Sequence, residues 1–189
     1  MAFWTEVVAE TKDPKRAFRF TLELTGFGAD SKIWFVKKVG KPSFTISETP
    51  HKYLNHTFYY PGKVEWNTIT ATLVDPVGPD VSATLSDLVQ LSGYRPPGTP
   101  DMTSTMSKGK SVGNLQDVII TQIDADGGMI EKWTLKNAWI KDLKFGDLDY
   151  DGDDMTMVDI EFRYDWAVLE TSVGSSIGSG TEFFSMTGV

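Results

Sequence analysis

Three aspartates at alternating positions form the pattern in this chain that is most like a metal site. Asp147, Asp149 and Asp151 precede Gly152. The calcium-binding EF-hand loop opens in the same way, because alternate carboxylates reach one cation and a glycine makes the sharp turn. The twelfth position of that loop supplies a bidentate glutamate, and here it is Val158. No flanking helices are predicted, so the sequence favours an acidic hairpin turn over a calcium site. It predicts no metal and no cofactor.

The residues that could carry nucleophilic catalysis stand in unsuitable places. The run GSSIG from Gly174 to Gly178 has the letters of a serine nucleophile elbow. That motif works only on a strained turn from a strand to a helix, whereas here it lies in a Ser/Gly-rich stretch. The two histidines, His51 and His56, fall in or beside a predicted loop that gives a catalytic triad no frame. The chain has no cysteine, which excludes thiolate sites and disulfides. We expect that this protein is not an enzyme.

Length and charge limit the remaining classes of protein. The chain has 189 residues, which suits one domain with a single core. Its net charge of -8 at pH 7 should repel a phosphate backbone, so the composition disfavours classical nucleic-acid binding. No stretch approaches the roughly 18 apolar residues of a membrane span. The N-terminus lacks the basic start and apolar run of a signal peptide. We expect neither a signal peptide nor membrane insertion by this subunit.

Hydrophobic periodicity predicts a mainly β protein with one helix. Apolar and polar residues alternate over Phe18–Leu24, as in a half-buried strand. Further strands are predicted over Ile33–Val39, Ser43–Ser47, Val118–Ile123, Met129–Leu135, Trp139–Phe145 and Val158–Trp166. Asp80 can cap a helix that ends at Gly93, with apolar residues at helical spacing between them. Arg95–Gly113 has little periodicity and is expected to form a long loop. The fold class predicted is a two-sheet antiparallel sandwich or barrel with one flanking α-helix and long projecting loops.

The rest of the chain is organised around His56–Pro76. Aromatic and β-branched residues flank the Pro61-Gly62 step, which predicts a strand, a wide projecting loop at that step and a second strand. The apolar residues of the second strand change parity between Trp66 and Ile69. Such a change indicates a bend near Asn67, after which the strand serves another surface.

Two end segments are expected to lie outside the main domain, which covers residues 17–170. Residues 1–16 form an N-terminal arm with Phe3 and Trp4, which either folds back on its own domain or docks on a neighbouring subunit. Residues 171–189 form a Ser/Gly-rich tail that is expected to be flexible. That tail ends in Phe183, Phe184 and Met186, which is unusual for a purely solvated end.

The order of these segments resembles the tail tube protein of contractile-tailed bacteriophages. The likeness includes the opening FRFTLEL and the closing segment VDIEFRYDWAVLE. Between them lie the long loop, a Gly, a Trp and a threonine-alternating strand that ends in Val-Asp. The resemblance spans Phe18 to Glu170. The extra tail after Glu170 departs from the family pattern and leaves open whether this is the repeating subunit or a tube-end or hub protein.

The resemblance implies a structural subunit whose copies form hexameric rings that stack into a hollow tube inside a contractile sheath. Its partners would be copies of itself, the tail sheath protein, and baseplate hub and tail terminator proteins, in a virion tail assembled in the host cytoplasm. DNA would pass without specific binding during ejection. Six copies at -8 each carry -48 per ring. The acidic residues Asp159, Glu161 and Asp165 of the last predicted strand are expected to line the lumen as a non-stick surface.

Two further groups of residues are expected to meet neighbouring subunits. The residues expected to stack one ring on the next are Phe3, Trp4, Lys41, His51, Tyr53, His56, Tyr59, Tyr60 and Pro61. The polar side of the predicted helix, Ser82, Ser86 and Gln90, would face the sheath. The rival interpretation from another class is a monomeric small-molecule-binding β-barrel, which would share the strand rhythm and enclose a dry central cavity.

Overall fold

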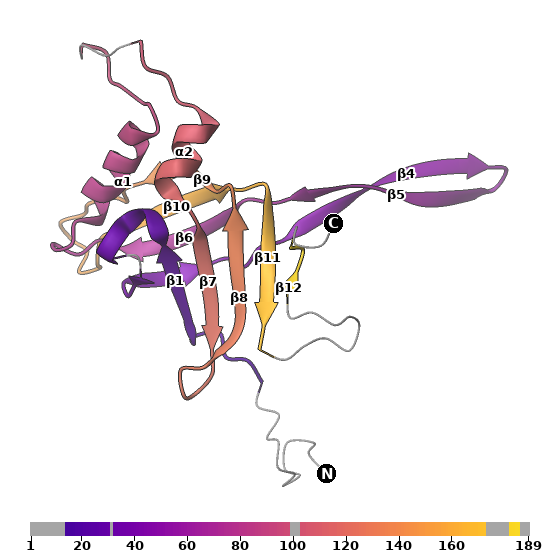
Figure 1. Cartoon of the computed structure of the whole chain (residues 1–189), viewed down its shortest axis with the longest axis horizontal. Helices are drawn as coiled ribbons and strands as arrows, with labels where there is room; N and C mark the ends of the chain where they lie inside the picture. The colour runs from indigo at the N-terminus through magenta and orange to yellow at the C-terminus, as the bar shows by residue number, and fades with distance from the viewer. Residues whose placement is uncertain (1–13, 31, 99–102, 173–181, 186–189) are drawn as a thin grey trace, which may run out of the picture.

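The computed structural model describes residues 14–30, 32–98, 103–172 and 182–185, which form two antiparallel sheets and a projecting ribbon (Figure 1). The six-stranded sheet has the order β12 (Glu182–Phe183), β11 (Trp166–Thr171), β8 (Met129–Lys136), β7 (Val118–Ile123), β1 (Phe20–Leu24) and β2 (Lys32–Ile33). The four-stranded sheet has the order β3 (Val36–Val39), β6 (Ile69–Val74), β10 (Met157–Arg163) and β9 (Trp139–Lys144). The ribbon pairs β4 (Phe44–Tyr53) with β5 (His56–Trp66). The predicted fold class, mainly β with a two-sheet antiparallel sandwich, is confirmed.

Large apolar side chains fill the space between the two sheets. Alternate residues of β1, β6, β7 and β10 point inward, as in β6, where Ile69, Ala71 and Leu73 are buried. The largest buried side chains are Tyr164, Phe162, Leu22, Leu24, Leu73, Leu85, Leu115, Leu135 and Ile160. The interior is therefore occupied by the protein's own side chains, and the rival interpretation of a barrel around a guest molecule gains no support from it.

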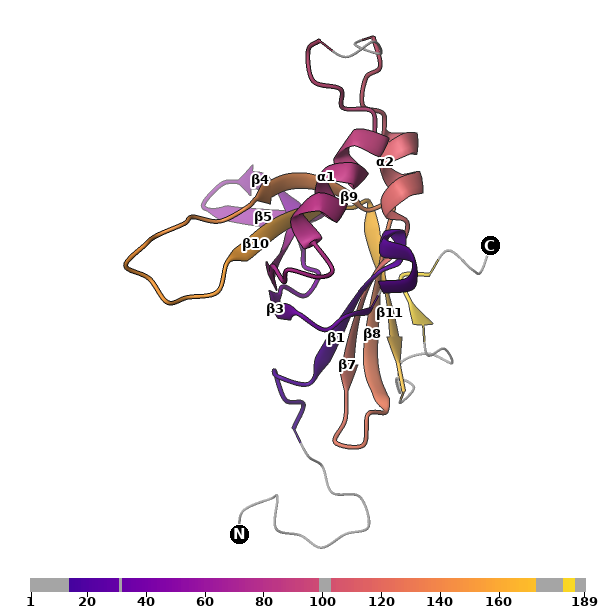
Figure 2. The ribbon, with the colours of Figure 1, turned by 90° about the vertical axis from the view of Figure 1, so that its left-hand side faces the viewer.

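Two α-helices, α1 (Val81–Leu91) and α2 (Lys108–Leu115), lie over one end of the sandwich (Figure 2). A short 3-10 helix, η1 (Thr25–Asp30), contacts α2. The prediction of α1 is confirmed at both ends. Asp80 accepts a hydrogen bond from the Ala83 N–H at 2.8 Å. Gly93 has φ +112, and a Cβ there would lie 2.3 Å from the Thr105 carbonyl oxygen. None of the helices in the described part of the chain is both long and apolar enough to cross a membrane.

Helix α2 was not predicted, because Arg95–Gly113 was expected to be a loop throughout. The helix has only 8 residues and contains two glycines, which are poor helix formers. Its stability comes from packing instead, since Leu115 and Ser111 are buried and α2 contacts both α1 and β9.

The last predicted strand, Val158–Trp166, is wrong as a single strand. It is divided between β10 in the four-stranded sheet and β11 in the six-stranded sheet. The chain changes sheets at Tyr164, which is buried between them, and at Asp165, whose N–H donates to the Lys136 carbonyl at 3.1 Å. The chain makes the opposite crossing from β8 to β9 at Asn137, a residue with φ +56. The Asn137 side-chain amide donates to the Asp165 carboxylate at 2.8 Å, which ties the two crossings together.

The ribbon is a continuation of the edge pair β3–β6. The chain leaves β3 at Gly40 and enters β4 at Phe44, and it returns from β5 to β6 through Asn67 and Thr68. The Asn67 N–H donates to the Ser43 carbonyl at 2.8 Å and closes the base of the ribbon. The predicted bend near Asn67 is confirmed. Pro61 and Gly62, however, lie inside β5 and not in a loop, and the ribbon turns at Leu54 and Asn55 instead.

Prediction for the helix cap. Asp80→Ala removes the side chain that accepts from the Ala83 N–H, so one donor in the first turn of α1 loses its partner. We expect the free energy of unfolding to fall by about 1 kcal/mol, as for other N-cap substitutions. Urea denaturation followed by circular dichroism measures the change. Asp87→Ala is the matched control, because Asp87 lies exposed on the same helix away from its cap. Equal losses in the two variants would contradict the capping role.

Candidate assembly surfaces

The β4–β5 ribbon exposes many apolar side chains that its own domain does not cover. All ten residues of β4 are exposed, as are nine of the eleven residues of β5. The exposed large apolar side chains of the ribbon are Phe44, Ile46, Tyr53, Leu54, Phe58, Tyr59, Tyr60 and Val64. Leu54 at the tip is 88% exposed. So many exposed apolar side chains on one element are typical of a surface that another macromolecule contacts.

A β-bulge divides the ribbon into two parts. Ile46 pairs with Val64 and Glu48 pairs with Pro61, so β5 holds one more residue than β4 between these pairs. The extra residue lies at Gly62 and Lys63, opposite Ser47. The Lys63 N–H donates to the Ser47 hydroxyl at 2.9 Å, and a Cβ at Gly62 would lie 2.4 Å from the same oxygen. Glycine is therefore required for the close approach of the two strands.

The bulge gives each face of the ribbon its own apolar region. Directly opposite residues share a face, and successive residues alternate between faces. On one face near the base lie Phe44, Trp66, Ile46 and Val64. On the other face near the tip lie His51, Tyr53, His56, Phe58 and Tyr60. The rings of His56 and Phe58 are 4.7 Å apart in an edge-to-face arrangement. The tip therefore presents an aromatic face, which we call the distal aromatic face.

An aromatic cluster holds the base of the ribbon on the sandwich. The Phe44 and Trp66 ring centroids are 5.1 Å apart, and Phe184 lies 5.9 Å from the first ring and 5.5 Å from the second. Trp66 also contacts the buried Tyr164, with the ring centroids 5.9 Å apart. Edge-to-face contacts at these distances stabilise the packing beyond the burial of area alone. The orientation of the ribbon thus depends on residues from three separate parts of the chain.

A second anchor lies where the chain leaves β3 for the ribbon. The Lys41 ammonium donates to the Glu131 carboxylate at 2.9 Å and to the Gln122 side-chain carbonyl at 2.8 Å. Lys15 also pairs with Glu131, and the Trp133 ring N–H donates to it at 2.5 Å. Burial raises the pKa of Glu131, but the hydrogen bonds from Lys15, Lys41 and Trp133 outweigh it and lower that pKa to about 2.

Six of the nine residues predicted to stack rings lie on the β4–β5 ribbon, but on two different faces. His51, Tyr53, His56 and Tyr60 share the distal aromatic face, whereas Tyr59 and Pro61 lie on the other face of the ribbon. Lys41 lies apart from them, in the Glu131 anchor. Phe3 and Trp4 lie outside the described residues. Whether any of these residues contacts a neighbouring subunit remains a prediction.

The residues predicted to line the lumen do not all lie on one strand. Asp159 and Glu161 point outward from β10, where Asp159 accepts from the Thr72 hydroxyl at 2.6 Å and Glu161 from Lys141 at 2.8 Å. The hydrogen bond from Lys141 holds the pKa of Glu161 below its ordinary value.

Asp165 lies at the crossing between the sheets, away from the outward row of β10, and accepts from Lys108 of α2 at 2.6 Å. Burial raises the pKa of Asp165, but the hydrogen bonds from Lys108 and Asn137 outweigh it and leave that pKa below its ordinary value. The expectation that these acidic residues form one row on a single strand is therefore wrong, because the strand is divided between two sheets.

The polar side of α1 borders a groove. Val81, Leu85 and Leu88 face the core, and Ser82, Ser86 and Gln90 lie away from it. The Ser82 hydroxyl donates to Asp75 at 2.5 Å and the Ser86 hydroxyl donates to the Ser82 carbonyl at 2.8 Å, so both hydroxyls have partners within the chain. A groove of about 420 Å³ runs beside them, lined by Ser86, Val89, Gln90, Tyr94, Met106, Ile140, Leu143 and Phe145. Its lining is mostly apolar.

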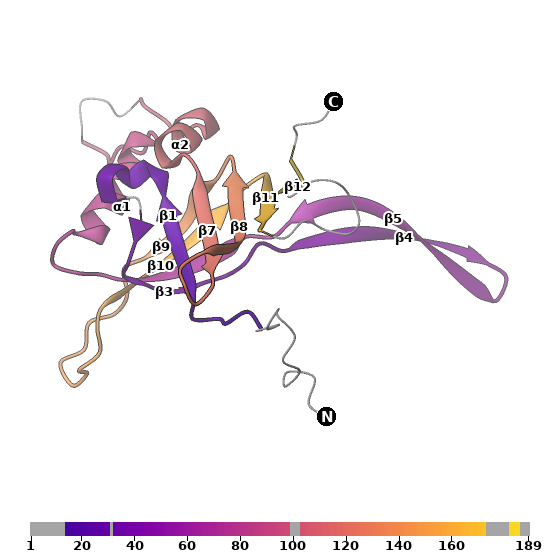
Figure 3. The ribbon, with the colours of Figure 1, turned by 60° about the horizontal axis from the view of Figure 1, so that its bottom comes forward.

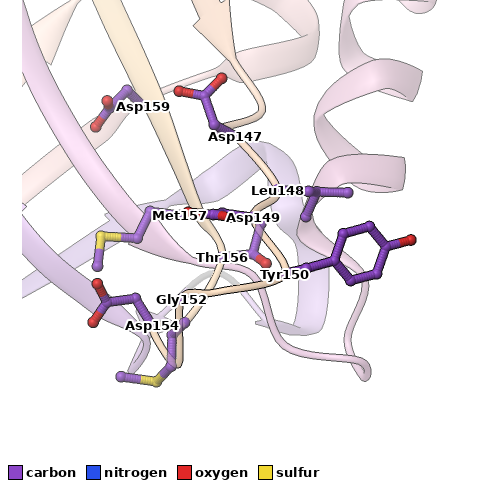
Figure 4. A pocket seen from close by; sticks show the side chains of 11 residues that line it. Asp147, Leu148, Asp149, Tyr150, Gly152, Asp154, Thr156, Met157 and Asp159 are labelled. Atoms are coloured by element: carbon purple, nitrogen blue, oxygen red, sulfur yellow. The ribbon is translucent and has the colours of Figure 1, made fainter.

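The acidic loop between β9 and β10 borders a shallow recess of about 630 Å³ (Figure 4). The carboxylates of Asp147, Asp154 and Asp159 do not converge on one point, and Tyr150 points away from them. Among the described residues, no group of three or more His, Cys, Asp or Glu side chains is arranged to hold a metal ion. The loop and the ribbon lie on opposite sides of the sandwich (Figure 3). The segment joins two antiparallel strands, as the predicted acidic turn requires.

Sequence reasoning missed several residues of these surfaces. No strand was predicted over residues 48–55, because the alternation weakens there and the residues become polar. In a two-stranded ribbon, each strand has an unpaired side, so Pro50 and Pro61 can be accommodated without losing a ladder bond. Ile46 and Phe58 lie in predicted strands, but the sequence did not single them out as exposed residues. The unusual apolar end at Phe183 and Phe184 was the available indication that this segment packs on the domain.

Comparison with solved structures gives the fold a known counterpart. The chain is 18% identical to a chain of the sheath-tube complex of an extracellular contractile injection system in its extended state, with a TM-score of 0.60 over 85% of this chain and 93% of that chain. It is 17% identical to a chain of the sheath/tube terminator of such a system, with a TM-score of 0.63 over 86% and 100%.

A chain of the six-fold symmetrised baseplate of the anti-feeding prophage gives 14% identity and a TM-score of 0.61 over 84% and 97%. A scan of protein-family models and a search of curated proteins found no match. At these identities the shared property is the fold. The predicted resemblance to contractile-tail tube proteins is confirmed at that level.

Prediction for the Glu131 anchor. The pKa of Glu131 is about 2 in the folded chain against 4.5 as the ordinary value, so the anchor stabilises the fold above pH 4.5 and is lost as the pH falls toward 2. We expect Glu131→Gln to lower the free energy of unfolding at pH 7 by about 2 kcal/mol. This is less than the full pKa shift would give, because the side chains of Lys15 and Lys41 are half exposed to water, which screens the interaction. The loss should shrink between pH 4.5 and pH 2. Thermal denaturation across that range measures it. Glu48→Gln on the exposed ribbon is the control, and a constant loss at every pH would contradict the account.

Proposed function

We propose that this protein is a structural subunit, and not an enzyme, of the tube of a contractile tail or injection particle. Its copies would join into hexameric rings that stack into a hollow conduit inside a sheath. The observation that carries the proposal is the β4–β5 ribbon, whose distal aromatic face is exposed and has no cover among the residues that the structure describes. The shared fold with chains of a sheath-tube complex and of a six-fold baseplate supports it.

The physical argument begins with the stability of the ribbon. An isolated two-stranded hairpin is marginally stable in water, because it has one hydrogen-bonded ladder and no packed face. Beyond its aromatic base, this ribbon has no third strand or helix against it among the described residues. Docking on another copy would supply the missing face. If the contact buried about 1,000 Å² of apolar surface, the gross gain would be about 25 kcal/mol, most of it offset by fixing the subunit and ordering its side chains.

Ring formation would use the edges of the sheets. The edges of the six-stranded sheet are β2 and β12, each with only two residues, and those of the four-stranded sheet are β3 and β9. Open edges invite pairing with another chain. A head-to-tail contact between different edges, repeated by a rotation that closes, produces a ring. In such a ring the total charge of -48 would keep DNA from adhering to the walls. We propose Asp159 and Glu161 for the lumen and Ser82, Ser86 and Gln90 for the side toward the sheath.

A subunit at the end of the tube is the second candidate. The observation in its favour is strand β12, because the segment after Ser172 adds a strand at an edge of the six-stranded sheet. The similarity to a terminator chain is as high as that to a chain of the tube complex, so the fold alone does not separate the two roles. An end subunit would form single rings, whereas a tube subunit would form long stacks. The partners proposed in both cases are copies of the chain, the sheath protein, and hub and terminator proteins.

Prediction for ring stacking. We expect the concentrated protein to form six-fold rings and tubes in negative-stain microscopy. Tyr53→Ser together with Tyr60→Ser removes two aromatic side chains from the distal aromatic face and leaves the core intact. Each lost aromatic contact is worth about 1 kcal/mol, so the variant should stack at a concentration at least about tenfold higher. Sedimentation velocity measures the assembly.

The matched control replaces two exposed side chains of the acidic loop, Leu148→Ser with Tyr150→Ser. Their loop, between β9 and β10, lies on the opposite side of the sandwich from the ribbon (Figure 3). If the control weakens stacking as much as the ribbon variant does, the ribbon is not the specific contact. If the unmodified chain remains monomeric at every concentration, with or without preformed tube fragments, the proposed function is wrong.

A further inference from the structure

The groove beside α1 lies at the end of the molecule away from the tip of the ribbon. Figure 1 and Figure 3 both show α1 at one end and the turn between β4 and β5 at the other. Three segments line the groove: α1 with Val89 and Gln90, the connection to α2 with Tyr94 and Met106, and β9 with Phe145 directly after it. Tyr94, Met106 and Phe145 are each about half exposed. The groove is therefore an open apolar surface that lies far from the ribbon tip of the same chain.

The groove has few charges and a few hydrogen-bonding groups. Lys141 and Asp142 are the charged residues of its lining, and Lys141 donates to Glu161 at 2.8 Å. The exposed side-chain amide of Gln90 can both donate and accept. The Ser86 hydroxyl donates its proton within α1 and keeps lone pairs that can accept. An occupant of the groove would thus meet an apolar lining with polar partners beside it.

The distal aromatic face has the complementary chemistry. Between Thr49 and Tyr60, Lys52 is the only Lys, Arg, Asp or Glu, and it pairs with Thr57 on the other face of the ribbon. The distal aromatic face therefore presents rings, hydroxyls and imidazoles but no carboxylate or ammonium group. Tyr53 and Tyr60 are 63% and 57% exposed, and a tyrosine that becomes buried keeps a hydrogen-bond partner for its hydroxyl. The polar groups beside the groove can serve as those partners.

We propose that the groove beside α1 is the docking site for the distal aromatic face of a second copy, so that ribbons of one ring enter the grooves of the next ring. This inference rests on the proposed function and names the surface that the ribbon meets. Because the two surfaces are different and lie at opposite ends of the chain, each copy both provides a ribbon and receives one. A contact between unlike surfaces continues from copy to copy when it does not close on itself. A stack of rings requires that property.

Two other hollows bordered by described residues suit an aromatic occupant less well. The recess beside the acidic loop is lined by four aspartates: Asp147, Asp149, Asp154 and Asp159. A hollow of about 350 Å³ bordered by β3 and β8 is lined by four charged residues: Lys37, Lys38, Lys41 and Glu131. Charged groups lose hydration when an apolar face covers them. Of the three, the groove beside α1 therefore requires the least desolvation of charge.

The size of the groove is adequate for this contact. Its volume of about 420 Å³ lies within the range of about 300–1,000 Å³ that is usual for sites that bury a ligand. Aromatic side chains bury about 150–250 Å² each, so Tyr53, Phe58 and Tyr60 together would bury about 450–750 Å². A stable interface buries about 800 Å² on each partner. The distal aromatic face would therefore supply about half or more of what one stacking contact needs.

The docked ribbon and the proposed sheath contact can share α1. Ser82 lies in the first turn of α1 and is not part of the groove lining, whereas Ser86 and Gln90 are part of it. Docking would cover the second half of α1 and leave its first turn toward the sheath. Ser86 and Gln90 would then lie at the border between the two contacts.

A carboxylate placed in the groove tests the docking site. Met106→Glu adds a charge to the lining at a side chain that is 49% exposed, so the fold should be kept. We expect this variant to form single rings but to stack only at a concentration at least about tenfold higher, because docking would remove water from the carboxylate. Leu91→Glu is the matched control, since Leu91 is 58% exposed on α1 and does not line the groove. Circular dichroism verifies the fold, and sedimentation velocity measures stacking.

A mixture of two blocked variants tests the direction of the contact. Rings of Met106→Glu keep the ribbon and have a blocked groove, whereas rings of Tyr53→Ser with Tyr60→Ser keep the groove and have a weakened ribbon. Preformed rings of the two kinds are mixed at a concentration where neither stacks alone. We expect pairs of stacked rings that grow no further, because only one ribbon-to-groove contact is intact in each pair. Negative-stain microscopy measures the number of rings in each particle.

Cross-linking tests which residues meet. The chain has no native cysteine, so copies with Tyr53→Cys can be mixed with copies that carry Gln90→Cys. In stacked rings, a short thiol-reactive cross-linker should join residue 53 of one copy to residue 90 of another. Tyr59→Cys replaces Tyr53→Cys in the matched control, because Tyr59 is also 63% exposed but lies on the other face of the ribbon. Mass spectrometry should detect much more of the link from residue 53 than of the link from residue 59.

The outcomes separate the docking site from the proposed function. If Met106→Glu stacks like Leu91→Glu, if the mixed rings form no pairs, or if the two cross-links are equally abundant, the groove is not the docking site and the proposed function stands. If folded Met106→Glu forms no rings, the groove acts in ring closure, which also overturns the inference. If the unmodified chain never assembles, the proposed function is wrong and the inference falls with it.

Discussion

The exposed two-stranded ribbon is the feature on which the rest of the structure depends. Its two strands are joined by one ladder of hydrogen bonds, and its distal aromatic face has no packed partner among the described residues. In the described part of the chain, the domain holds the ribbon at its base, through the ring contacts of Phe44 and Trp66 with Phe184 and Tyr164 and through the Lys41–Glu131 pair beside the entry to β4. An element held in this way is directed outward by a rigid support, and its free faces gain stability when another molecule covers them.

Several acidic residues of the domain form ion pairs with lysines, so the negative charge is not spread evenly over the surface. Glu131, Glu161 and Asp165 each accept a hydrogen bond from a lysine, and the pKa of each lies below its ordinary value. These pairs lie at places where the fold is joined: the entry to the ribbon, the pairing of β9 with β10, and the crossing between the sheets. The net charge of -8 then belongs largely to exposed turns such as Asp147–Asp154. Acidic residues that are close in the sequence therefore have different roles: Glu161 pairs with Lys141 of β9, whereas Asp165 pairs with Lys108 of α2.

The sequence was most informative where local chemistry decides the structure. The cap of α1 at Asp80, its end at Gly93 and the bend at Asn67 depend on neighbouring residues, and all three were predicted. It was least informative where distant packing decides. Val158–Trp166 reads as one strand because the alternation continues through Tyr164, and only the burial of that tyrosine between two sheets shows the crossing. The ribbon turn was placed at Pro61 and Gly62, because proline followed by glycine suits the two central positions of a type II turn. Pro61 instead pairs with Glu48 inside β5, and Gly62 with Lys63 forms a bulge that changes which side chains share a face.

Hydrogen exchange at the ribbon tests the central claim most directly. Amides of residues 48–61 should exchange rapidly in the dilute monomer, because a ladder without a packed face opens easily. In assembled rings or tubes the same amides should be strongly protected, while the amides of β6 and β10 should be protected equally in both states. Protection of the ribbon in the monomer equal to that of the sandwich core, with no increase on assembly, would contradict the claim that the ribbon is completed by another copy.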